Sequence, residues 1–387
     1  MTAVPEVTMP APRRRDAPPN DHRGSWIPNG AMIAKRFMEL RRRRGLMIAL
    51  AVVTIGIPSI FLIIRLLMHA FAPHTYGPAG GYDIFTGLVA GVLYIFGFIV
   101  AATLGCIAGA GDLQEGVFRH LVVTGRSRVA TYLARIPAGL AIIGSLIATG
   151  YAIVCLVCCL AAPRDLNYQG TNVPAGLSRA SLVTWAGDNY GPVLCDFPFR
   201  FNGGPKGGQN ALFPPPCNQN GQIDLSQMPP GQKAPTVAQM RSFAEQVAEQ
   251  DYTDYSKQFL SPSIGLMVRT GLWIELEAAV GFVVALGLAS LIGQRTIAVI
   301  LMIVLEVILT PLFLRAHIPH MINLQRSVVG IAMDHLGPAA LPIAFAGGQN
   351  DQSQIVMMTR PWAYVVVIAW LVVWTALGAW RMTTRDT

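Results

Sequence analysis

Six long apolar runs dominate this sequence, and each is close to or longer than the ~20 residues that a helix needs to cross a hydrocarbon core. The runs lie at residues 46–68, 84–110, 133–161, 270–292, 296–316 and 361–380. Charged residues make up only 13% of the chain, whereas soluble domains carry roughly a quarter. We therefore predict an all-α polytopic membrane protein with six transmembrane helices.

Basic residues are concentrated on one side of this predicted bundle. They occur before the first run, between the second and third runs, between the fourth and fifth, and after the sixth. By the positive-inside rule, we expect both termini to be cytoplasmic and the chain to lie in the plasma membrane. The net charge of +8 then reflects topology and contact with anionic membrane lipids. No nucleic-acid partner is expected.

The residues before the first run divide into two parts. Residues 1–24 are rich in proline and arginine and are expected to be a disordered cytoplasmic leader. In residues 25–45, Ile33, Phe37 and Leu40 share one helical face and basic residues share the other. This pattern predicts an amphipathic helix at the membrane interface.

Two longer segments are predicted to lie outside the cell. Residues 163–269 form an extracytoplasmic insert, and residues 317–360 form an external helical segment. The insert contains Gly-, Pro- and Asn-rich stretches typical of loops. It also contains "TVAQMRSFAEQVAEQ", whose apolar residues recur at helical spacing, with Thr236 as the expected N-cap. The remaining domain plan is 46–162 for helices 1–3, 270–316 for helices 4–5, and 361–387 for helix 6 and the tail.

The six cysteines follow the same topology. Cys195 and Cys217 lie in the insert, where an oxidising compartment favours one disulfide between them. The other four lie within apolar runs, and there we expect small packing residues rather than a metal site. They are Cys106, Cys155, Cys158 and Cys159.

A compact charged segment, "GDLQEGVFRHLVVTGRSR" at residues 111–128, interrupts the second and third runs. Asp112 and Glu115 suit the positive N-terminal end of a short helix, and Thr124-Gly125 is expected to end it. A helix of this kind on the cytoplasmic surface is suited to docking into a partner's groove. An ordinary polar loop is the alternative that the residues alone leave open.

This segment resembles the coupling helix of ABC-2-type transporter permeases, the membrane subunits of ABC exporters. In that family an acidic residue precedes a G-T-L-x-x-L run, a Thr-Pro break and basic residues that enter the third span. Here Glu115-Gly116 leads the run and Leu121 closes it, while Val117, Phe118 and Gly125 replace the family's Thr, Leu and Pro. The plan of an amphipathic helix, six spans and cytoplasmic termini also resembles that family's type V exporter-like fold. The large insert after the third span departs from it.

The resemblance implies a pump whose ATPase is a separate subunit. The chain has no G-x-x-x-x-G-K-[ST] sequence, so ATP and Mg²⁺ would be bound by the partner ATPase and this chain would not be an enzyme by itself. The second permease would be an identical copy or a sister chain. The coupling contacts are then expected from the following residues: Asp112, Glu115, Gly116, Phe118, Arg119 and Leu121. The expected cargo is a hydrophobic or amphiphilic compound, such as a drug, a lipid or a lipid-linked or secondary metabolite, and it would move outward.

Ionisable residues inside apolar runs are costly and are candidates for function. Glu306 is the deepest, and Glu277 lies in the fourth run. Either could contact substrate or form a pair within the bundle, for instance with Arg65. Aromatic residues that could line an amphiphile path are Tyr94, Phe98 and Trp273. His317 and His320, with Asp334-His335 downstream, have loose spacing, and no metal site or catalytic set is predicted.

Two other functions remain open from the sequence. The first is a non-transporting scaffold or signalling subunit whose external insert binds a partner. The second is a membrane enzyme of envelope lipid metabolism, which would need polar catalytic residues gathered at one interface.

Overall fold

The computed structural model of the chain describes most of the membrane bundle and part of the insert. The described residues are 26–72, 79–114, 127–162, 165–168, 171–174, 177–196, 217–218, 223–224, 226, 234–259, 261–315, 320–338, 341 and 356–384. Within them the fold is mostly helical, with one two-stranded antiparallel hairpin. Residues 1–24, the predicted leader, lie outside the described part.

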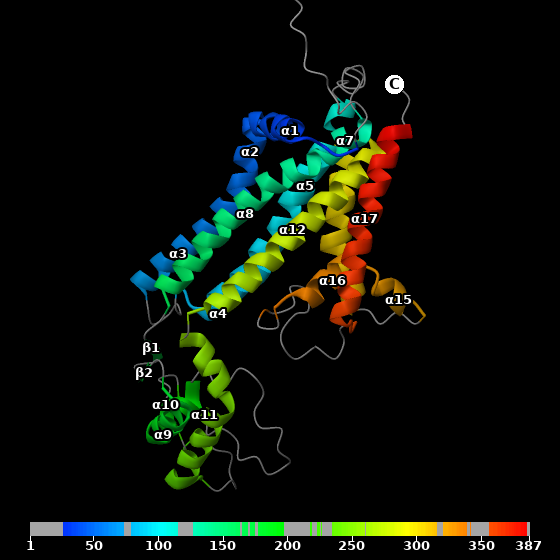
Figure 1. Cartoon of the computed structure of the whole chain (residues 1–387). Helices are drawn as coiled ribbons and strands as arrows, with labels where there is room; N and C mark the ends of the chain where they lie inside the picture. The colour runs from blue at the N-terminus through cyan, green and yellow to red at the C-terminus, as the bar shows by residue number, and fades with distance from the viewer. Residues whose placement is uncertain are drawn as a thin grey trace, which may run out of the picture.

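The elements follow one another in a simple up-and-down order (Figure 1). In the first half, with η for a π-helix, they are α1 (Gly30–Arg42), α2 (Arg44–Ala51), η1 (Val52–Gly56), α3 (Ile57–Phe71), α4 (Tyr82–Leu88), η2 (Val89–Leu93), α5 (Tyr94–Gln114), α7 (Arg128–Leu133), α8 (Arg135–Leu160), β1 (Asp165–Tyr168), β2 (Thr171–Pro174), α9 (Arg179–Asp188) and α10 (Tyr190–Asp196). In the second half they are α11 (Val237–Phe259), α12 (Ile264–Ile292), α13 (Arg295–Ile303), η5 (Val304–Leu309), α14 (Thr310–Arg315), α15 (Ile322–Gln325), α16 (Val329–Leu336) and α17 (Arg360–Thr384).

Six helical stretches of the described chain are long and apolar enough to cross a membrane, which confirms the predicted number. They are Arg44–Phe71, Tyr94–Gly111, Arg128–Leu160, Ile264–Ile292, Arg295–Leu314 and Arg360–Thr384. The fourth begins earlier than the predicted residue 270. Ser263 caps α12, because its hydroxyl accepts a hydrogen bond from the Leu266 amide at 3.2 Å. The helix therefore includes residues 264–269, which the prediction had assigned to the insert.

The centre of the bundle is the pair of α5 and α12. In the most apolar 18-residue stretch of each span, 72% of the residues are buried in α12 and 61% in α5. In the other four spans only 22–28% are buried. Gly105 and Gly109 of α5 form a G-x-x-x-G face against the α12 backbone. A Cβ atom on Gly109 would lie 2.6 Å from the Leu286 carbonyl oxygen. The two backbones thus approach closely, and the outer spans expose their apolar side chains.

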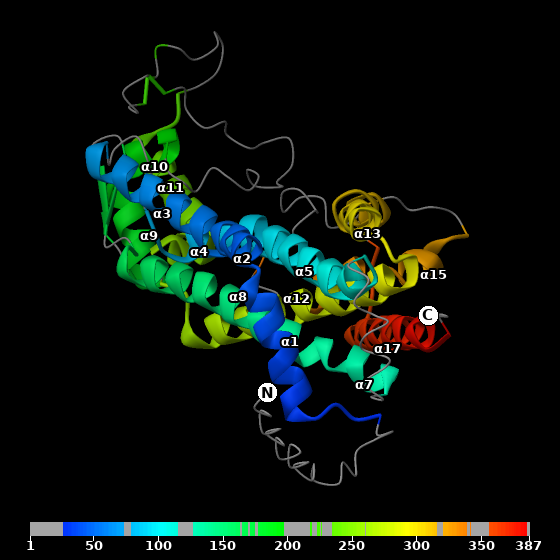
Figure 2. The same ribbon diagram turned by 90° about the horizontal axis from the view of Figure 1, so that it is seen from above.

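At one end of the bundle, α1 crosses α8, and α7 and the C-terminal end of α17 lie at the same end (Figures 1 and 2). Asn29 begins α1 by accepting a hydrogen bond from the Met32 amide at 2.9 Å. Beneath α1, the buried Arg135 donates hydrogen bonds to the carbonyls of Ala108 at 3.0 Å and Gly109 at 3.2 Å, near the end of α5. The predicted helix before the first span is therefore present, over residues 30–42.

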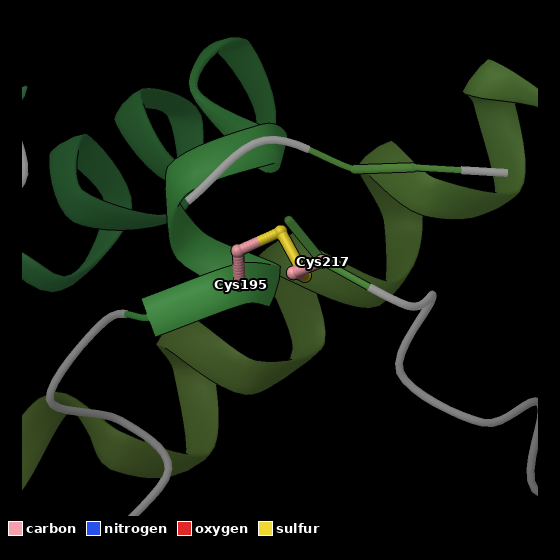
Figure 3. The surroundings of a disulfide bond; sticks show 2 residues. All are labelled: Cys195 and Cys217. Carbon is pink, nitrogen blue, oxygen red and sulfur yellow. A yellow bond between two sulfur atoms is a disulfide. The ribbon is translucent and has the colours of Figure 1, made fainter. Parts of the chain in front are cut away.

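The insert lies at the opposite end and has a small core of its own (Figure 1). Its core packs α9 and α10 against α11. Thr236 and Gln239 form a capping box at the start of α11: the Gln239 amide donates to the Thr236 hydroxyl at 3.3 Å, and the Thr236 amide donates to the Gln239 side chain at 2.9 Å. The predicted Cys195–Cys217 disulfide is confirmed and ties α10 to the segment at Cys217 (Figure 3).

The segment between the fifth and sixth spans returns to the bundle as α15 and α16. The Trp370 indole of α17 donates to the Ser327 carbonyl at 2.8 Å. The Gln325 amide group donates to the Phe313 carbonyl of α14 at 2.9 Å. Residues 327–336 are therefore held against α14 and α17, at the end of the bundle that also carries the insert (Figure 1).

Candidate functional site

Three carboxyl groups from three elements meet in the half of the bundle opposite α1. Glu277 comes from α12, Glu306 from η5 and Asp334 from α16. Their exposed fractions are 2%, 1% and 7%. Glu277 is within electrostatic range of both other carboxyls, and the Tyr94 hydroxyl is within range of all three. We call these three acids, with Tyr94 and Trp273, the carboxyl cluster.

Glu306 is held by two hydroxyl groups. The Tyr94 hydroxyl donates to its Oε1 at 3.4 Å, and the Thr310 hydroxyl lies 3.4 Å from its Oε2. Glu306 sits on a π-helical turn, and Thr310 also bonds the Leu305 carbonyl five residues back at 3.0 Å. A second π-helical turn, η2, ends just before Tyr94. Such wide turns inside spans often accompany functional sites, because they redirect a side chain.

The aromatic pair forms one wall of the cluster and holds α16 in place. The rings of Tyr94 and Trp273 stack with centroids 4.9 Å apart and an interplanar angle of 12°. The Trp273 indole donates to the Met333 carbonyl of α16 at 2.9 Å, and both groups are buried. One side chain therefore contributes to the aromatic wall and also fastens the helix that carries Asp334.

A glycine allows α16 to approach the carboxyls closely. A Cβ atom on Gly330 would lie 2.5 Å from the Thr310 hydroxyl oxygen and 2.8 Å from Oε2 of Glu306. No side chain larger than hydrogen fits there without movement of α14 or α16. The backbone of α16 is thus in contact with the polar end of Glu306.

Several polar atoms of the cluster have no hydrogen-bond partner of normal geometry. Among the described residues these include Oε2 of Glu277 and both carboxyl oxygens of Asp334. Burial raises the pKa of Asp334 from 3.8 to about 7, although the nearby Tyr94 hydroxyl opposes part of this shift. Asp334 lies outside the six spans, but its surroundings are as dry as those of the two glutamates. The cluster therefore has unused capacity to accept hydrogen bonds or positive charge.

The structure brings together four of the five residues predicted for a substrate path. Glu306, Glu277, Tyr94 and Trp273 belong to the carboxyl cluster. Phe98 lies one turn further along α5, where its ring would be 2.8 Å from a Cβ on Gly281. It packs α5 against α12 in the bundle core.

Sequence reasoning did not assign Asp334 to this site. It considered Asp334 only beside His335 as part of a loose metal pattern. The signal that could have found it is a single carboxylate in the apolar stretch "SVVGIAMDHLG", which is the same signal that singled out Glu306. In the structure the His335 ring nitrogen lies 2.8 Å from the Ile331 carbonyl, within its own helix. No group of three or more His, Cys, Asp or Glu residues in the described chain is arranged to hold a metal ion.

The predicted coupling segment is described only at its edges. The backbone of Asp112 belongs to the last turn of α5, and α7 begins at Arg128, which donates to the Thr383 carbonyl of α17 at 3.1 Å. The other predicted coupling residues, Glu115, Gly116, Phe118, Arg119 and Leu121, lie outside the described residues. Their part in docking stays a prediction.

Comparisons of the chain with protein-family models, with curated proteins and with solved structures give no match.

Proposed function

We propose that this chain is the membrane permease subunit of an ATP-driven transporter of the ABC-2 type, and that it exports a hydrophobic or amphiphilic compound across the plasma membrane. The observation that carries the proposal is the arrangement at the α1 end. There an amphipathic helix crosses α8, and α7, which begins at Arg128, lies beside the C-terminal end of α17. In this proposal the partner ATPase docks at this end, against residues 111–128, the segment that resembles a coupling helix.

The carboxyl cluster is the second support. Ionisable groups in the apolar part of a bundle cost several kcal/mol when unpaired. A purely structural bundle gains nothing from three of them, whereas a path for a polar or charged part of a substrate requires such groups. ATP hydrolysis would come from the partner ATPase, and the conducting unit would contain a second permease, either an identical copy or a sister chain.

The test is purification of the full chain from its native membrane in mild detergent, with mass spectrometry of the accompanying proteins. An ATPase with a phosphate-binding loop should accompany the wild type and be lost with Glu115→Lys. Glu249→Lys, the same substitution on the exposed surface of the insert at the opposite end of the bundle, is the matched control and should keep the ATPase. If no ATPase accompanies the wild type, the proposal is wrong.

A second candidate function is favoured by the insert. It has a separate core, a disulfide and ion pairs on its surface, including Arg179 with Glu249 at 3.0 Å. A scaffold or signalling subunit could bind a partner through such a domain. Recovery of envelope proteins alone in the same experiment would favour this candidate.

A further inference from the structure

Among the described residues, the groups that act on the carboxyl cluster include no cation. The hydrogen bonds of Glu306 come from Tyr94 and Thr310, and the groups that act electrostatically on the three carboxyls are the other carboxyls and the Tyr94 hydroxyl. No lysine, arginine or histidine in the described chain acts on them. Three carboxylates that lie close enough to act on one another in an apolar environment would repel one another strongly. The closed cluster is therefore expected to hold protons.

The surroundings of the carboxyls indicate which cation would fit. The described acids are not arranged to coordinate a metal ion. The rings of Tyr94 and Trp273 stack on each other, and the Tyr94 hydroxyl reaches Glu306. Aromatic rings attract ammonium-type cations to their faces. Around them the bundle is apolar, with Phe98 and Leu93 also buried. An amphiphilic cation satisfies both the charge and the apolar walls.

We propose that the carboxyl cluster is the binding site for an amphiphilic organic cation, and that α16 is the cover of this site. This inference rests on the proposed function, because the cation would be one of the amphiphilic compounds that the transporter exports. It names the chemistry of the head group, which the transporter assignment alone leaves open.

Access requires α16 to move. It is held by the Trp273 indole on the Met333 carbonyl and by the close approach of Gly330 to Glu306 and Thr310. Its residues 329–334 are also buried and pack against α14 and α17, so displacement of this eight-residue helix must break those contacts as well. The cover also carries Asp334, so that opening it removes one of the three acids from the cluster.

Cation entry must release protons for charge to balance. A carboxylic acid of the cluster loses its proton to solvent, and the resulting carboxylate faces the cation. The groups that face one another here are Tyr94 of α5, Glu277 of α12, Glu306 of η5 and Asp334 of α16, with His335 beside Asp334 on the cover. Affinity for a permanent cation should therefore rise with pH, by at most about tenfold per pH unit where one proton is released.

The experiment uses the full chain in nanodiscs of zwitterionic lipid and equilibrium dialysis with tetraphenylphosphonium, whose charge does not titrate. Tetraphenylborate has the same shape and the opposite charge, and empty nanodiscs correct for partitioning into lipid. We expect saturable binding of the phosphonium, no saturable binding of the borate, and an affinity that rises between about pH 5.5 and about pH 8.

Variants assign the site. Glu277→Gln and Glu306→Gln keep side-chain volume and should each weaken phosphonium binding by about tenfold or more, because a charge-assisted contact is lost. Glu275→Gln is the matched control: Glu275 is two residues from Glu277, but its carboxylate faces Gly144 of α8, and a Cβ there would lie 3.1 Å from it. Phosphonium binding by Glu275→Gln should match that of the wild type. Equal unfolding temperatures would show that the bundle persists.

Three results would overturn the inference: no saturable phosphonium binding by the wild type, equal binding of the borate, or equal weakening by Glu275→Gln. These results are distinguishable from failure of the proposed function. Phosphonium binding without an accompanying ATPase would preserve this site and remove the transporter assignment. If an ATPase is lost with Glu115→Lys but the chain does not bind the phosphonium, the transporter assignment stands and the cation site is wrong.

Discussion

We expect the charge state of Asp334 to affect how tightly α16 is held, because its carboxyl is buried in the docked helix. In the docked helix its pKa is raised to about 7, from an ordinary value of 3.8. When α16 is displaced, the carboxyl meets water and the pKa returns toward the ordinary value. The docked state thus binds the proton more strongly. The stabilisation of docked α16 by the protonated Asp334 carboxyl is full below about pH 4 and is lost as the pH rises through about 7.

Asp334→Asn should remove most of this pH dependence, because the amide stays neutral. Hydrogen exchange of peptides covering α16, corrected for the intrinsic rate at each pH, measures the docking. In the wild type, protection should fall between about pH 4 and about pH 7, and in Asp334→Asn it should stay nearly level. Asp188→Asn changes the same side chain on the exposed surface of the insert and is the control. A wild-type profile that does not change with pH would contradict this account.

The individual acids inside the spans were predictable from the sequence, because an ionisable residue in an apolar run is conspicuous. Their convergence was not. Glu275 and Glu277 are the same residue type in the same apolar run, yet Glu275 faces α8 and Glu277 faces Glu306. Which face of α12 turns toward which neighbour depends on helix packing. That packing is set by contacts such as Gly109 on Leu286, from residues far apart in the chain.

At the scale of elements, the packing of α5 on α12 depends on its glycines. Gly109→Ala would bring Cβ to 2.6 Å from the Leu286 carbonyl oxygen, a backbone atom that cannot turn aside. Such overpacking typically costs about 1–3 kcal/mol. We expect Gly109→Ala to lower the unfolding midpoint in a detergent titration followed by circular dichroism.

Gly87 of α4 provides the matched control, since a Cβ there would have nothing within 4 Å. Gly87→Ala should leave the midpoint unchanged or raise it slightly, because alanine favours a helix over glycine by roughly 0.5–1 kcal/mol. Equal shifts for the two variants would mean that the α5–α12 contact is not tight.

The elements themselves were largely predictable, because apolar length and cap residues act locally. The six spans, the helix before the first span and the Thr236 cap all follow from neighbouring residues. The π-helical turns of the described chain, η1, η2 and η5, did not follow from the sequence. Each inserts one extra residue into a turn, and in η5 the Thr310 hydroxyl bonds the Leu305 carbonyl five residues back within the same helix.

At the scale of the whole molecule, the described chain has two large cores of different kinds, besides a small cluster of Leu314, Val328 and Ile331. One belongs to the membrane bundle and the other to the insert. The small core of the insert is supplemented by the disulfide, which spans 22 residues of sequence. Restricting a loop of this length in the unfolded chain is typically worth about 2–4 kcal/mol.

Cys195→Ser with Cys217→Ser should therefore speed proteolysis within residues 163–263 while the bundle remains intact. The measurement is limited proteolysis of the purified chain, with a parallel unfolding titration of the bundle. Cys155→Ser alters a free cysteine within the third span and should leave cleavage of the insert unchanged. Loss of the bundle transition in the double variant would show that the two cores are one cooperative unit.

The positions of the cluster residues along the chain also set an order for its biosynthesis. Tyr94 leaves the ribosome with the second span, Glu277 and Glu306 follow with two spans joined by only two residues, and Asp334 comes later with α16. Until then, the two glutamates are without the residues that cover them, in a membrane that favours their neutral form. Asp334 and α16 arrive together, and α17, against which α16 packs, follows them.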